Sequence, residues 1–225
     1  MPMSFANGSG LLNVNLNFVK TLSEVNLKKN DSFVIVGQAK DLKTLTVSHL
    51  GTVLKDLEIP ETWFDESLNY LCPNKDKKNE SEPSASGSSV SWLNKLIMHK
   101  ISSKTSRNNT PQRSHLITKV VKQTAFSENQ TILVACERQY SIACACAVAR
   151  AYPLYSRKTS DTNTSRSVTV TFLFTDEIRN KTGQELSNDD DVRCFNTMGD
   201  SVRLSAKITD MPCAEMNTDD FLNVR

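Results

Sequence analysis

The sequence is poor in glycine, and its glycines do not form a phosphate-binding loop. Only 7 of the 225 residues are glycine, and Gly-x-Gly-x-x-Gly does not occur. The one close pair, Gly8-Ser9-Gly10, precedes an expected strand instead of following one. Dinucleotide and P-loop sites need glycines after a strand, because the backbone amides there must approach phosphate closely. The sequence therefore gives no support to these nucleotide-binding classes.

An excess of one charge and a long apolar run are also missing. The chain has 27 basic and 25 acidic side chains, a net charge of +2, so nothing favours nucleic acid or an anionic membrane as a partner. The longest apolar run, around Ser141 to Ala151, is far shorter than the roughly 20 residues of a membrane span. The first ten residues have neither a basic nor an apolar signal region, so we expect a cytoplasmic protein without a secretory signal.

Cysteine and histidine do not occur at metal-site spacings. The six cysteines include no C-x-x-C pair, which is typical of a reduced cytosolic protein. Cys144 and Cys146, near Cys136, are two positions apart on an expected helix and point about 200° apart, so they cannot chelate one ion. We interpret them as core packing. The histidines are spread over different expected elements, without a nucleophile to pair with: His49, His99 and His115.

Acidic residues give no better candidate. Asp189-Asp190-Asp191 lacks the glycine and the distal glutamate of a calcium loop, and we interpret it as solvated loop carboxylates. The sequence therefore predicts no catalytic, cofactor-binding or metal-binding residue in this chain.

Strand and helix patterns alternate along the chain. Period-two alternation or short β-branched runs predict strands at 12–18, 33–36, 90–101, 131–136 and 168–174. Helical spacing and start signals predict helices at 40–57, from Pro60 at N1 to 71, from a capping Ser114 to 121, at 140–152, and from Asp200 at N-cap to 208. Polar composition predicts flexible loops at 72–89 and 102–113, and a long loop or a short edge element at 175–199. The alternation predicts an α/β fold: a mixed, mostly parallel sheet flanked by helices.

Five segments in the same order resemble the leucyl aminopeptidase (cytosol aminopeptidase) family. They are Ile35–Gln38, Ser114–Thr118, Val134–Glu137, Ala145–Leu154 and Val202–Leu222. The motif Pro-Cys-x-Glu-Met-Asn-Thr in the last segment resembles the probable aminopeptidase-like-1 branch of animals. Ala214 stands where that family usually has Asn.

The resemblance implies a non-catalytic N-terminal portion. It implies a macro-like α/β domain over 1–199 and a linker helix with the first turn of a truncated catalytic domain over 200–225. The family's two divalent metal ions, zinc or manganese, are held in motifs resembling Val-Gly-Lys-Gly and Asn-Thr-Asp-Ala-Glu-Gly-Arg. Asn217-Thr218-Asp219 continues as Asp220-Phe221-Leu222 and so departs from the second motif, and we interpret it as a helix N-cap. No catalytic residue carries over.

Three functional hypotheses follow. The first is a fragment, inactive alone, of a metal-dependent aminopeptidase that releases N-terminal amino acids. The alternative is a non-catalytic oligomerisation or regulatory module, by self-association or within the family's hexamers. The third, a macro-type ADP-ribose binder, would need a glycine-rich loop after a strand. For the C-terminal segment we expect a partly exposed apolar set: Leu204, Ile208, Met211, Met216 and Phe221.

Overall fold

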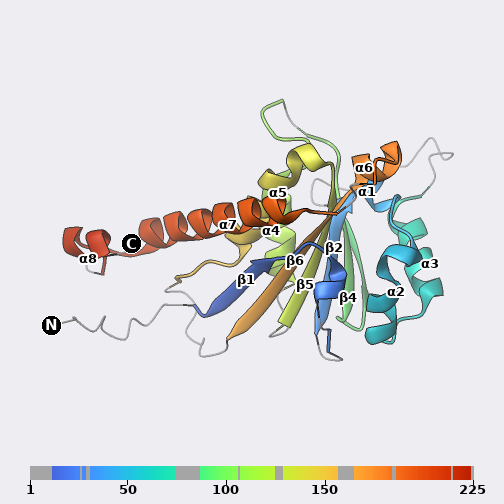
Figure 1. Cartoon of the computed structure of the whole chain (residues 1–225), viewed down its shortest axis with the longest axis horizontal. Helices are drawn as coiled ribbons and strands as arrows, with labels where there is room; N and C mark the ends of the chain where they lie inside the picture. The colour runs from blue at the N-terminus through green and yellow to red at the C-terminus, as the bar shows by residue number, and fades with distance from the viewer. Residues whose placement is uncertain are drawn as a thin grey trace.

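One six-stranded sheet organises the protein. The computed structural model describes residues 12–25, 27–28, 31–73, 87–105, 107–124, 129–156, 165–183, 186–213 and 215–223 (Figure 1). The strands are β1 (Val14–Phe18), β2 (Ser32–Gln38), β3 (Ser88–Trp92), β4 (Leu96–Ile101), β5 (Asn129–Cys136) and β6 (Arg166–Phe174). Their order is β1-β6-β5-β2-β4-β3, and every pairing is parallel except that of β3 with β4. The predicted mixed, mostly parallel sheet is confirmed.

Helices cover both faces of this sheet. They are α1 (Ala39–Leu42), α2 (Val47–Asp56), α3 (Glu61–Leu71), α4 (Ser114–Gln123), α5 (Ser141–Ala151), α6 (Thr175–Asn180), α7 (Asp189–Asp210) and α8 (Thr218–Asn223), with 3-10 turns η1 (Leu22–Glu24) and η2 (Arg138–Tyr140). On one face α4, α5 and α7 bury a core with strand residues such as Val36 and Phe172. On the other, α1, α2 and α3 bury Phe33, Ile35 and Leu133. No helix within the described ranges has the length and apolarity to cross a membrane.

The central strands explain why both faces must be covered. All seven residues of β2 are buried, as are all but the first residue of β5. Such a strand has a nearly continuous apolar sequence because neither of its faces is exposed to water. The edge strand β1 instead alternates, with Leu16 and Phe18 buried and Asn15 and Asn17 exposed. The predicted strands at 12–18, 33–36, 131–136 and 168–174 are confirmed.

Three predicted elements differ from the structure in their boundaries. The single helix predicted at 40–57 is two helices, because Thr46 forms a capping box with His49 and starts α2 anew. Pro60 is the N-cap of α3 instead of its first residue. Ser114 is the first residue of α4, and its N-cap is Arg113 in a left-handed conformation with φ of 47°.

The single strand predicted at 90–101 is a hairpin. β3 and β4 are joined through Leu93 and Asn94, which have φ of 48° and 57°. Two successive left-handed residues define a type I′ turn, whose usual Asn-Gly signal this sequence lacks. Of the predicted loop 72–89, residues 74–86 lie outside the described ranges, and Ser88 and Ser89 already belong to β3.

The predictions of a long loop or a short edge element at 175–199 and of a helix starting at Asp200 are wrong. Residues 175–180 form α6, and α7 begins at Asp189 and continues to Asp210. Asn188 accepts a hydrogen bond from the Asp191 amide at 2.8 Å, and three aspartates in the first turn favour the helix dipole. The predicted domain boundary at 199/200 therefore falls inside one continuous helix.

α7 is attached to the sheet by a buried polar anchor. Arg203 is only 4% exposed, and its guanidinium donates to the carbonyl of Tyr152 at 2.9 Å and to that of Val14 at 2.5 Å. Asn196 exchanges two hydrogen bonds with the backbone of Phe18, at 3.1 and 3.3 Å, and so pairs the free edge of β1. The C-terminal part of α7 extends past the sheet and carries α8 at its far end (Figure 1).

Candidate functional site

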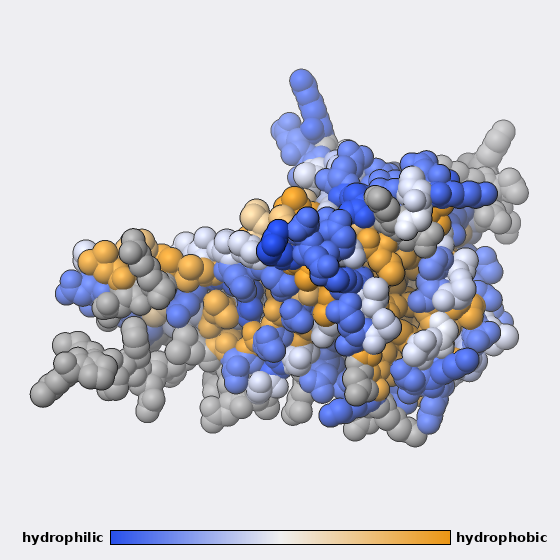
Figure 2. Space-filling model, in the orientation of Figure 1, coloured by the Kyte–Doolittle hydropathy of each residue, from blue (hydrophilic) through white to orange (hydrophobic). Residues whose placement is uncertain are grey.

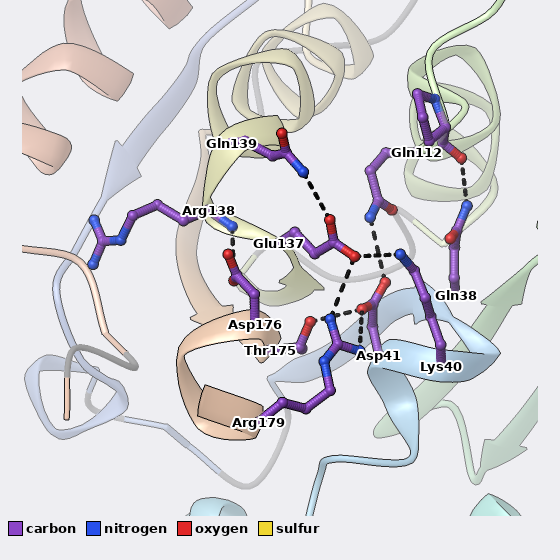
Figure 3. Close-up of polar contacts among 11 residues, drawn as sticks. Gln38, Lys40, Asp41, Gln112, Glu137, Arg138, Gln139, Thr175, Asp176 and Arg179 are labelled. Carbon is purple, nitrogen blue, oxygen red and sulfur yellow. Dashed lines mark hydrogen bonds and ion pairs between the residues drawn. The ribbon is translucent and has the colours of Figure 1, made fainter. Parts of the chain in front are cut away.

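Polar side chains converge where β2, β5 and β6 end. The chain leaves β2 toward β4 and leaves β5 toward β6, so β2 and β5 flank the topological switch point of the sheet. Open α/β sheets bind ligands in the crevice outside the carboxyl ends of their strands at such a point. Residues that follow each strand end meet here (Figure 3), among them Asp41, Glu137 and Thr175.

Asp41 is the buried centre of the cluster. Its side chain is fully buried and accepts hydrogen bonds from Thr175 Oγ1 at 2.6 Å and Gln112 Nε2 at 3.3 Å. Arg179 Nη1 lies 3.7 Å from its Oδ1. Burial raises the pKa of Asp41, and the hydrogen bonds from Thr175 and Gln112 act in the opposite direction. The carboxylate therefore joins the ends of β2 and β6 to the segment that precedes α4.

Glu137 is the second carboxylate and pairs with two cations. Its Oε1 accepts from Lys40 and from Arg179 Nη2, the latter at 3.3 Å, and Gln139 donates to its Oε2 at 2.9 Å (Figure 3). The hydrogen bond from Lys40 is the main cause that lowers the pKa of Glu137. Arg179 thus bridges Asp41 and Glu137, and Lys40 closes the outer side of the cluster.

The next residue, Arg138, points away from this cluster and holds α6 and α7. Its backbone amide donates to Asp176 Oδ1 at 3.0 Å. Its guanidinium pairs with Glu177 at 3.3 Å and Asp191 at 2.6 Å, and lies 4.1 Å above the ring of Phe174. A cation that contacts two carboxylates and a ring face is held in one orientation.

The chemistry of the cluster follows from this pairing. Asp41 and Glu137 are both paired with cations and donors of the chain itself. Among the described residues, no three His, Cys, Asp or Glu side chains come together as they would around a metal ion. The exposed parts of the cluster are cationic, because Lys40 and Arg179 keep 45% and 37% of their side-chain surface. The geometry fits a structural clasp of three strand ends.

The cysteines considered above lie where core packing was expected. Cys136 and Cys144 are fully buried, and their mutual hydrogen bond and burial raise the pKa of Cys136 well above its ordinary value. Cys146 is half-buried, and burial raises its pKa as well. Raised pKa values keep thiols protonated and poor as metal ligands. The core-packing interpretation is confirmed for Cys144.

The histidines and the other polar motifs lie apart from one another. His49 belongs to the α2 cap, His99 lies on β4 and His115 is exposed on α4. The run Asp189–Asp191 starts α7 instead of lying in a loop. The predicted cap at Asn217 is confirmed, because its Oδ1 accepts from the Asp219 amide at 2.9 Å. Ala214 lies outside the described residues.

The cluster around Asp41 was not anticipated from the sequence, although a signal exists. Parallel strands end at one edge of the sheet, so polar residues one to five positions after each predicted strand should meet there. Asp41, Glu137 and Thr175 all satisfy that rule. Gln112 does not, because it lies in a segment predicted to be a flexible loop.

Comparisons with known proteins agree with this architecture. A probable aminopeptidase, NPEPL1 of Homo sapiens, is 29% identical over 213 residues, which are 94% of this chain and 38% of the relative. The NPEPL1 protein of Mus musculus is 30% identical over 190 residues, 84% of this chain and 34% of the relative. The chain thus spans little more than a third of the length of these curated relatives.

Solved structures share the fold. The leucine aminopeptidase LAP1 of Caenorhabditis elegans matches 93% of this chain and 39% of its own, with a TM-score of 0.68 and 20% identity. The leucyl aminopeptidase of Leishmania major, solved with actinonin, matches 96% of this chain and 39% of its own, with a TM-score of 0.58 and 18% identity. At these identities the likeness concerns the fold alone.

A family model matches more than half of the sequence. The M17 aminopeptidase N-terminal domain 2 matches residues 31–161, from the start of β2 to just beyond α5. This range is more than half of the 225 residues and holds Asp41, Gln112 and Glu137. The protein therefore belongs to the M17 aminopeptidase family, with the N-terminal domain 2 of that family at its centre.

Proposed function

We propose that this chain is the N-terminal, non-catalytic portion of a metal-dependent leucyl-type aminopeptidase. The observation that carries the proposal is the family match to an N-terminal domain, in a chain that spans 38% of a probable aminopeptidase. The geometry supports it, because the carboxylates at the switch point, Asp41 and Glu137, are paired with Lys40 and Arg179 of the chain itself.

The chemistry would then come from the catalytic domain of a full-length parent. The family resemblance implies two divalent metal ions there, zinc or manganese, which activate water against the peptide carbonyl. In that arrangement this chain contributes a rigid α/β body in the cytoplasm, and α7 leads from it toward the catalytic domain. The switch-point clasp ties α6 to the strand ends through Arg179, and Arg138 ties the start of α7 to the end of β5 through Asp191.

A chimera tests the proposal. The chain should replace the aligned N-terminal region of human NPEPL1, with the unaltered relative and its isolated catalytic region as controls. The expected chimera is soluble and releases N-terminal amino acids at a rate within about tenfold of the relative, sensitive to a chelator. A folded chimera without activity, beside an active relative, would contradict the proposal.

A second candidate function is that of an assembly module. The observation that favours it is the apolar surface at the C-terminal end, where Leu204 is 38%, Phe221 54% and Leu222 68% exposed. The expected partial exposure of this segment is confirmed, since Ile208, Met211 and Met216 are also only half-buried. Side chains of this kind favour association by roughly 1.5–3 kcal/mol each when buried.

Sedimentation of the full chain against a shortened one tests the assembly role. Deletion of 200–225, the linker and first turn that the resemblance implies, would divide α7 and remove Arg203. The structure moves the cut to after Met211. The full chain should associate at tens of micromolar and the chain ending at Met211 should not; a monomeric full chain would exclude the assembly role.

A further inference from the structure

α5 and α7 are parallel and closely packed. Ala149 lies opposite Gly199, and farther along both helices Arg203 donates to the carbonyl of Tyr152 at 2.9 Å. A Cβ atom at Gly199 would lie 3.5 Å from that of Ala149. The two Cβ atoms of a disulfide are about 3.5–4.5 Å apart. The two helices therefore approach closely enough for a link of that size between their side chains.

Cys146 and Cys194 occupy matching positions on these two helices. Arg150 of α5 and Met198 of α7 line the same groove. Cys146 lies one helical turn before Arg150, and Cys194 lies one turn before Met198. Because the helices are parallel, moving back one turn on each brings the two cysteines to face each other. Burial is the main cause that raises the pKa of Cys146, and the nearby Cys194 is the second.

This pair is open to solvent and lies on the body of the domain. Cys146 and Cys194 are both half-buried, so a small reagent can reach them, whereas Cys136 and Cys144 are fully buried. Asn196, two residues after Cys194, is bonded to the backbone of β1. The pair is thus separate from the α7–α8 arm, whose apolar surface lies at its far end (Figure 2).

We propose that Cys146 and Cys194 form a reversible thiol–disulfide modification site that joins α5 to α7. The oxidant is a small-molecule disulfide such as glutathione disulfide. The Cys194 thiolate attacks one sulfur of the oxidant and releases the first small thiol. The Cys146 thiolate then attacks Cys194 Sγ in the mixed disulfide and releases the second. The protein gives up two electrons and two protons, and the two released thiols carry them away.

The link would add a covalent bond to the contacts that hold α7. In the reduced chain α7 is held by Arg203, Asn196 and the close packing at Gly199. A bond between residues 146 and 194 closes the intervening chain into a loop and so restricts the unfolded state. Oxidation should therefore stabilise the folded domain.

Glutathione buffers of increasing disulfide content test the site in the full chain. Because the two thiols are held side by side, their link should be half-formed while the exposed Cys213 is still mostly unmodified. Mass spectrometry of unreduced peptides should detect Cys146 joined to Cys194 within one chain. The midpoint of thermal unfolding should rise by at least about 5 °C and return to its first value on reduction with dithiothreitol.

Matched serine substitutions provide the controls. Cys194→Ser removes one half of the link and should abolish both the linked peptide and the redox-dependent shift of the thermal midpoint. Cys213→Ser makes the same change at an exposed thiol outside the pair and should keep both. Circular dichroism verifies that the variants are folded.

Two outcomes would overturn the proposal. In the first, Cys146 and Cys194 remain thiols or carry separate glutathione adducts when Cys213 is fully modified. In the second, Cys146 or Cys194 is joined to another cysteine of the chain instead. Both outcomes are measured on the wild-type chain, so they do not depend on the folding of a variant. Neither bears on the aminopeptidase proposal, which the chimera tests.

Discussion

At the scale of single residues, the buried carboxylate of Asp41 is the most consequential group of the switch-point cluster. Replacing it by alanine leaves Thr175, Gln112 and Arg179 without a shared acceptor. Removing one partner of a fully buried pair costs about 3–5 kcal/mol, but Arg179 is partly exposed and can regain water. Asp41→Ala should therefore lower the free energy of unfolding by about 2 kcal/mol, measured by urea denaturation.

A matched control makes the Asp41 prediction specific. Asp65 is exposed on α3, so Asp65→Ala should change stability by less than about 0.5 kcal/mol. Equal effects of the two substitutions would show that the cluster is not a clasp.

His99 predicts a pH dependence of stability. Burial lowers its pKa to about 4, and its Nε2 is buried without a hydrogen-bond partner among the described residues. The unfolded chain has a histidine pKa of about 6.5, so unfolding takes up a proton between these values and stability falls as the pH falls through this window. Because of His99, the free energy of unfolding should be about 2 kcal/mol smaller at pH 5 than at pH values above 6.5.

Urea unfolding at pH 7 and pH 5 measures the His99 contribution. In His99→Gln the difference in stability between the two pH values should shrink by that amount. His115→Gln, at an exposed position of α4, is the control and should keep the wild-type difference. An unchanged difference in His99→Gln would contradict the assigned pKa.

Residue roles were predictable where local chemistry decides them. The burial of Cys144 follows from its position on an apolar helix, and the cap at Asn217 follows from the residue type. The partners of Asp41 could not be predicted, because Gln112 and Thr175 are 71 and 134 positions away along the chain. Only the order of strands in the sheet brings them together.

At the scale of elements, Gly199 explains how α7 packs on the domain. A Cβ at this position would lie 3.2 Å from Phe18 Cε2 and 3.5 Å from the Cβ of Ala149. Gly199→Val would therefore separate α7 from β1 and α5, at a cost of about 2 kcal/mol. Gly51, inside α2, has nothing within 4 Å of such a Cβ.

The comparison of the two glycines is a test of helix packing by thermal or urea unfolding. Gly51→Val should be neutral within about 0.5 kcal/mol, because valine and glycine have similar helix propensities. A destabilisation of both variants by the same amount would mean that propensity, and not contact with Phe18, decides the effect.

Element prediction succeeded for strands and failed at the start of α7. Fully buried strands such as β2 and β5 can be predicted because their sequences are short apolar, β-branched runs. The acidic residues at 189–191 and the glycine at 199 suggested a loop, because the sequence does not show that Asn188 caps a helix or that Gly199 is needed for close packing. The I′ turn at Leu93 and Asn94 was missed for a similar reason: tertiary pairing of β3 with β4 imposes a conformation that these residues rarely adopt.

At the scale of the whole molecule, accessibility to protease reports on the connection between β4 and α4. Residues 103–105 and 107–111 are exposed, whereas Ser102 and Gln112 at its two ends are buried. Trypsin should therefore cut after Lys104 or Arg107 well before it cuts inside α4 or α5. Mass spectrometry of early digests should show a C-terminal fragment that retains Ser114 to Phe174. Early cleavage after Arg138 or Arg150 would contradict the packing of this core.

The α/β class was predictable because strand and helix patterns alternate over the whole chain. The strand order was not, since a parallel sheet is assembled from pairings distant in sequence, such as β1 with β6. The family resemblance was carried by short segments, and the match over residues 31–161 confirms it.

The most direct test of the account is an activity assay on the isolated chain. Its central proposal is that peptide hydrolysis belongs to a catalytic domain outside these 225 residues. The purified chain should be assayed for hydrolysis of a leucyl amide substrate with zinc, manganese or cobalt added. An active leucyl aminopeptidase is the positive control. The account predicts no release of the leaving group above the buffer rate with any of the three metals. Metal-dependent turnover that a chelator abolishes and that co-purifies with the chain would contradict it.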